Sequence, residues 1–156
     1  MEFINKFLVV FLAINLFLIL EQWRILSLAG VSPNLLLILF LLASFFQTGF
    51  LFMAFLGVAV FLVFAVFMPF WLLQAALIIF LVFAMKFGRG FLSGNVFLDF
   101  LITLFLGTAG FYFLLKIFSA GSFESIIVLK EIVYNLILGA AGWFLLRLFQ
   151  KKQFLK

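Results

Sequence analysis

The sequence predicts an all-α integral membrane protein, a polytopic bundle of about six transmembrane helices that forms one transmembrane domain over residues 1–156. Hydrophobic residues make up 69% of the chain and charged residues only 10%, whereas a soluble domain has about 25% charged residues. From Ile25 to Met85 no side chain is charged, and this stretch is long enough for about three crossings of ~20 residues each. A soluble domain of this length leaves much of its surface in water, so lipid is the solvent that the composition fits.

The first expected span covers residues 3–20 and ends at the polar group Glu21-Gln22-Trp23-Arg24. Lys6 before an apolar run is typical of a signal peptide, but bulky and charged residues follow this run directly. Ser27-Leu28-Ala29 is a poor cleavage site. We therefore expect an uncleaved first helix.

The next three spans are expected at residues 33–46, 50–67 and 69–85, because Pro, Gly and polar residues separate them. Pro33 suits the first turn of its helix, where the missing N–H costs nothing, and Ser32 is the expected cap. The short connections predict an antiparallel series of helices. Spans this short tilt little, thin the bilayer locally, or enter it only in part.

The last two spans are expected at residues 96–118 and from about residue 123 to 148, after a polar loop over residues 86–95. Asn95 is the predicted N-cap of the fifth helix, and Asp99 lies in its first turn, where a carboxylate complements the helix dipole. We expect Asp99 to pair with Lys86 or Arg89.

The distribution of Lys and Arg predicts that both termini are cytoplasmic. With six spans, the side that holds both termini collects most of the positive residues, and the opposite side collects few, diluted by acidic ones. The termini side has Lys6, Lys86, Arg89, Arg147, Lys151, Lys152 and Lys156, whereas the other has Arg24, Lys116 and Lys130. Trp23 and Trp71 are then expected near the outer interface and Trp143 near the inner one, as in aromatic belts.

This topology predicts the result of reporter fusions. A reporter at Lys156 and one in the loop over residues 86–95 should both report the cytoplasm, because both lie on the side rich in positive residues. A periplasmic signal from either fusion would rule out the six-span arrangement.

The composition argues against catalysis and against metal or cofactor binding. The chain has no cysteine and no histidine, which removes thiolate chemistry, the commonest metal ligand and the commonest general base. No phosphate-binding loop and no nucleophile–base pair is recognisable. The formal charge of +5 is interpreted as an orientation signal, so we expect a bilayer and no nucleic acid around the protein. The protein is therefore expected not to be an enzyme.

Polar residues inside the spans are the default functional candidates. Asn15 is expected to make an interhelical hydrogen bond. Glu131 and Asn135 are four residues apart and share one helix face, which should look at protein rather than lipid. Whether that face meets a partner or the fifth helix is open. Glycines spaced by three are expected to bring the fifth and sixth helices close together: Gly107, Gly110, Gly139 and Gly142.

Two segments resemble the rod shape-determining MreD family. The stretch from Leu20 to Leu39, Leu-Glu-Gln-Trp-Arg-Ile-Leu-Ser-Leu-Ala-Gly-Val-Ser-Pro-Asn-Leu-Leu-Leu-Ile-Leu, is similar to the family's outer connection and its Gly-Val-Arg-Pro-Asp-Leu entry into the second helix. Pro33 and Asn34 stand at the Pro-Asp positions. Asn135-Leu136-Ile137-Leu138-Gly139, followed by Phe144-Leu145-Leu146-Arg147-Leu148, resembles the family's last helix. The third span departs from the family because it has no Asp at its end.

The resemblance implies a non-enzymatic component of the bacterial cell-wall elongation machinery in the inner membrane. It would work with MreC and, through it, with the MreB filament, the RodA polymerase and its transpeptidase. The residues expected to matter for partner binding are Pro33, Asn34, Glu131, Asn135, Gly139 and Gly142.

Two other functions stay open. A substrate-binding S component of an energy-coupling-factor vitamin transporter has a similar size and six helices, but this chain lacks an Ala-xxx-Ala docking motif on the first helix and polar outer loops. A channel or flippase-like protein is the third possibility. The lack of charged residues inside the first four spans argues against an ion pathway there.

Overall fold

The computed structural model describes residues 8–9, 11–16, 19, 27, 31–46, 49–67, 71–88, 94–119 and 124–153, and these are mainly helical. Residues 11–16 belong to the first predicted span and are helical. The all-α prediction is therefore confirmed. The helices that follow are α2 (Leu35–Phe46), α3 (Phe50–Phe67), α4 (Leu72–Gly88), α5 (Val96–Ser119) and α6 (Ser125–Gln153).

Three of these helices, α3, α5 and α6, are long and apolar enough to cross a membrane, whereas α2 and α4 are shorter. Six crossings and the cytoplasmic side of both termini stay predictions. Several residues on which the predicted topology depends lie outside the described part of the chain: Lys6, Trp23, Arg24, Arg89 and Lys156.

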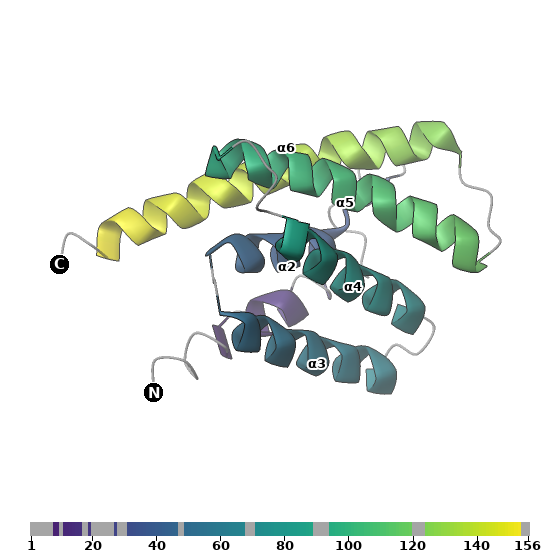
Figure 1. The fold of residues 1–156 in the computed structure, drawn as a ribbon, viewed down its shortest axis with the longest axis horizontal. Coiled ribbons are helices and arrows are strands. Elements are labelled where there is room, and N and C mark those ends of the chain that lie inside the picture. Colours follow the sequence, from purple (N-terminus) through teal and green to yellow (C-terminus); the bar gives the residue numbers. More distant parts are fainter. Residues whose placement is uncertain are drawn as a thin grey trace.

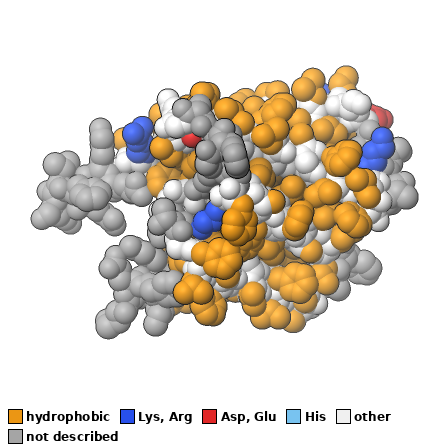
Figure 2. Space-filling view, viewed as in Figure 1, with side chains coloured by type: hydrophobic (Ala, Val, Ile, Leu, Met, Phe, Trp, Pro, Cys, Tyr) orange, Lys and Arg blue, Asp and Glu red, His pale blue; other side chains and the backbone are white. Residues whose placement is uncertain are grey.

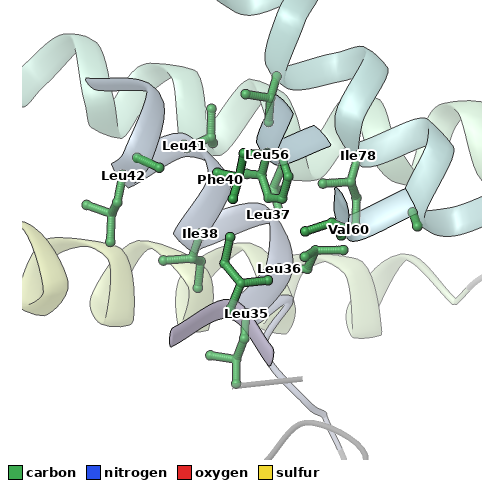
Figure 3. Packing of buried hydrophobic residues seen from close by; sticks show 14 of the residues in the cluster. Leu35, Leu36, Leu37, Ile38, Phe40, Leu41, Leu42, Leu56, Val60 and Ile78 are labelled. Carbon is green, nitrogen blue, oxygen red and sulfur yellow. The ribbon is translucent and has the colours of Figure 1, made fainter. Parts of the chain in front are cut away.

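Helix α2 lies at the centre of the bundle. It contacts α4, α5 and α6, while α5 also packs on α4 and on α6, and α3 packs on α4 (Figure 1). With 12 residues it is about 18 Å long at 1.5 Å per residue, well short of the ~30 Å hydrocarbon layer. Leu36, Leu37, Phe40 and Leu41 on this helix are all at most 3% exposed, and Figure 3 shows them among side chains of neighbouring helices. Helix α2 is thus covered by protein on nearly every side.

Helix α3 has one face toward the bundle and one away from it. The inward face repeats every three to four residues, with Met53, Leu56 and Val60 buried. The outward face is equally apolar, and its Leu62 and Val66 are mainly exposed. An exposed apolar surface this continuous suits lipid and not water. Hydrophobic side chains likewise cover much of the described part of the face seen in Figure 2.

The helix starts test the predicted caps. Asn95 Oδ1 accepts hydrogen bonds from the N–H groups of Phe97 and Leu98, at 3.1 and 3.3 Å, and Asp99 lies in the first turn of α5. Both predictions at this helix start are confirmed. The prediction for α2 was wrong by two residues, because the helix begins at Leu35 and Asn34, not Ser32, caps it.

Trp143 does not belong to an aromatic belt, contrary to the prediction. It is 5% exposed. Its ring packs against α2 and α5, with centroid distances of 4.8 Å to Phe46 and 5.0 Å to Phe100. Its indole N–H has no hydrogen-bond acceptor among the described residues. An interfacial tryptophan needs its polar end at the headgroups, so here the ring serves as core packing. Trp71, by contrast, is exposed.

Candidate functional site

The start of α2 is fixed by Asn34. Its Oδ1 accepts the N–H of Leu37 at 3.0 Å, and its carbonyl accepts the N–H of Ile38 at 3.1 Å. This is the geometry of an N-cap, which satisfies donors that a helix cannot satisfy itself. Because Asn34 is only 7% exposed, its own backbone N–H also needs an acceptor inside the protein.

That acceptor is the side chain of Asn135 on α6, 101 residues away in sequence. The N–H of Asn34 donates to Asn135 Oδ1 at 2.9 Å. Asn135 Nδ2 donates to Thr108 Oγ1 on α5 at 3.1 Å, and the Thr108 hydroxyl donates to the carbonyl of Leu104 at 2.9 Å. Asn135 and Thr108 are both fully buried. One amide thus connects the start of α2 to both long helices.

Glu131 extends this network by one turn of α6. Its carboxylate accepts a hydrogen bond from the Tyr112 hydroxyl on α5, and it lies four residues before Asn135 on the same face of α6. Glu131 is 6% exposed. The polar face of Glu131 and Asn135 therefore meets α5 and the residue before α2. Its hydrogen-bonding groups have partners inside the chain. We name Asn34, Thr108, Tyr112, Glu131 and Asn135 the polar network.

The glycines serve close approach between helices, but not only between the two that were predicted. A Cβ at Gly139 would meet the side chains of Leu104 and Phe100 on α5, which agrees with the prediction. A Cβ at Gly142 would lie 2.9 Å from Leu42 of α2. The two glycines of α5, by contrast, face α4, so the prediction that they pack on α6 was wrong: a Cβ at Gly107 would lie 2.8 Å from Met85, and one at Gly110 would lie 3.3 Å from Leu81.

The six predicted partner-binding residues converge partly on one place. Asn34, Glu131 and Asn135 belong to the polar network, and Pro33 precedes it directly in the chain; Gly139 lies one turn beyond Asn135. Gly142 lies farther along α6, against α2. All six are buried or half-buried against other parts of the chain. A substitution at any of them would therefore affect a partner only indirectly, by changing how this chain packs.

Two residues of the network were missed by the sequence reasoning, Thr108 and Tyr112. They are four residues apart on α5 and so share one helix face, which is the same signal that singled out Glu131 and Asn135. Asn15 was predicted to bond another helix, but its Nδ2 donates to the carbonyl of Phe11 in its own helix at 2.8 Å.

A shallow groove runs between α5 and α6 on the outer surface of the bundle. Its lining is entirely apolar. Ile137 and Phe105 in its walls are largely exposed. The residues that line it are Leu101, Ile102, Phe105, Leu106, Leu136, Ile137 and Ala140.

The polar network can connect helices through hydrogen bonds. It holds one carboxylate, one phenol, two amides and one hydroxyl, and no three acidic side chains come together anywhere in the described ranges. Hydrogen bonds of this kind hold elements in register, and a satisfied buried network specifies one arrangement of the helices. Comparison with protein-family models, with curated proteins and with solved structures finds no match for this chain.

Proposed function

We propose that this chain is a non-enzymatic, multi-pass component of the bacterial inner membrane that acts as a scaffold in cell-wall elongation, as the resemblance to the MreD family implies. The observation that carries the proposal is the hydrogen bond from Asn34 N–H to Asn135 Oδ1, 2.9 Å long. The two segments that resemble the family are far apart in sequence, yet their asparagines meet at one buried point. The two segments that resemble the family are therefore parts of one structural unit, which this hydrogen bond joins.

A scaffold of this kind offers its outer helix faces to partners. The polar network is satisfied inside the bundle, so a partner is not needed to complete it. The faces that remain are apolar and exposed, such as that of Leu62 and Val66 on α3 and that of Leu129 and Val133 on α6. Helices associate in lipid through close packing of such faces. A single-span, MreC-type protein is the partner that the resemblance implies.

Depletion of the protein tests this function. Rod-shaped cells should become round within a few generations, because elongation would lose a membrane component while division continues. Co-expression with the MreC-type protein should recover a stable pair from detergent. Normal cell shape on depletion, together with a new requirement for an external vitamin, would favour the S-component function in place of this one.

The partner-binding face can be mapped by crosslinking, since the chain has no cysteine of its own. Single cysteines at Leu62 and Val66 report on α3, and single cysteines at Leu129 and Val133 report on α6. All four positions are exposed, so the substitutions should leave the bundle intact. Crosslinks to the MreC-type protein from one face, with the other face as the matched control, would identify the interface.

A further inference from the structure

We propose that the groove between α5 and α6 binds an anionic phospholipid, with an acyl chain in the groove and the phosphate beside Arg147. This inference does not rest on the proposed function. The juxtaposition that carries it is an apolar groove that leads, along one face of α6, to an exposed arginine.

The groove supplies the acyl-chain half of this site. Its walls are apolar side chains from two helices, with the small side chain of Ala140 among them. It is open along the surface that faces away from the bundle, where Ile137 is 62% exposed and Phe105 is 45% exposed. A groove of this shape in a membrane protein receives a hydrocarbon chain without any desolvation of polar groups.

The helical repeat places Arg147 in line with the groove. At 100° per residue, Leu136, Ala140 and Arg147 lie within about 40° of one another around the axis of α6. Arg147 is seven residues beyond Ala140, about 10 Å farther along the helix. Phe144, exposed between them and 5.2 Å from Phe97 between ring centroids, continues the apolar floor toward Arg147.

The end of α6 is free to meet headgroups. It extends to Gln153 and projects beyond the other helices at the C-terminal end of the molecule (Figure 1). Arg147 is exposed. A guanidinium next to an apolar groove at the membrane surface matches a phosphate whose acyl chain lies in that groove. This charge complementarity selects an anionic lipid over a partner helix as the occupant.

Lipid binding to the purified, delipidated full-length protein tests the proposal. The probes are phosphatidylglycerol and phosphatidylcholine with the same acyl chains, and native mass spectrometry measures the dissociation constant of each. Phosphatidylglycerol should bind more tightly. Arg147→Gln should weaken its binding about fivefold, as expected for one cation beside an anionic surface, and should leave phosphatidylcholine binding nearly unchanged.

Two further variants separate this site from general effects. Lys130→Gln removes an exposed cation near the other end of α6 and should change neither constant. Ile137→Trp fills the groove from an exposed position, so it should keep the unfolding temperature but weaken both lipids. Equal losses for Lys130→Gln and Arg147→Gln, or unchanged lipid binding in Ile137→Trp, would overturn the proposal. The proposal would also fail if Ile137→Trp abolished the binding of a protein partner and left both lipid dissociation constants unchanged.

Discussion

Replacing Asn135 with leucine is expected to destabilise the bundle by roughly 3 kcal/mol. Leucine has a similar size but no polar atoms, so the buried N–H of Asn34 loses its acceptor, at a cost of about 1–3 kcal/mol. The interhelical hydrogen bond to Thr108 contributes roughly another 0.6 kcal/mol. Reversible unfolding in mixed detergent micelles measures the free energy of unfolding of the wild-type protein and of the Asn135→Leu variant.

Asn15→Leu is the matched control for this variant. It makes the same chemical change in a side chain that donates a hydrogen bond within its own helix, to the carbonyl of Phe11, so its effect should stay below about 1 kcal/mol. A double-mutant cycle of Asn135→Leu with Thr108→Val should show a coupling of at least about 0.5 kcal/mol, as expected for two groups in one network. Equal losses at Asn15 and Asn135, or purely additive effects in the cycle, would show that the network does not hold the helices together.

The helices themselves could be predicted from the sequence because apolar stretches and their breaks are local signals. The prediction for residues 50–67 coincides with α3, and that for residues 96–118 differs from α5 by one residue. The start of α2 was misplaced because Ser32 and Asn34 both cap helices well. The choice between them depends on the hydrogen bond from Asn34 N–H to Asn135, which is a tertiary contact.

The candidate site could be predicted only in part for the same reason. Spacing along α6 placed Glu131 and Asn135 on one face, but nothing in the periodicity states what that face meets. The glycines of α5 and α6 have similar spacing, yet Gly107 faces Met85 of α4 while Gly139 faces α5. The rotation of each helix about its own axis decides these contacts, and an apolar helix with nearly uniform hydrophobicity gives little sign of that rotation.

Close packing at Gly139 constrains the rotation of α6. Gly139→Val is therefore expected to lower the free energy of unfolding by about 3 kcal/mol. The added Cβ would meet Leu104 and would lie 3.3 and 3.4 Å from ring atoms of Phe100. Both neighbours are fully buried, so neither has room to move, and α5 must shift away from α6. Even Gly139→Ala should destabilise by about 1 kcal/mol, although alanine favours helix by roughly that amount.

Gly110→Ala tests whether the effect comes from packing, because it makes the same change in the middle of α5. There the nearest atom to the added Cβ is the end of the Leu81 side chain, at 3.3 Å, and Leu81 is only partly buried, so it can turn away. This variant should be neutral or stabilised by up to about 1 kcal/mol. Gly139 also adjoins Leu136 and Ala140 in the groove wall, so Gly139→Val should weaken the binding of phosphatidylglycerol and phosphatidylcholine together as the two helices separate. Equal stability of the two alanine variants would mean that α5 and α6 are not held at the close distance on which both the groove and the polar network depend.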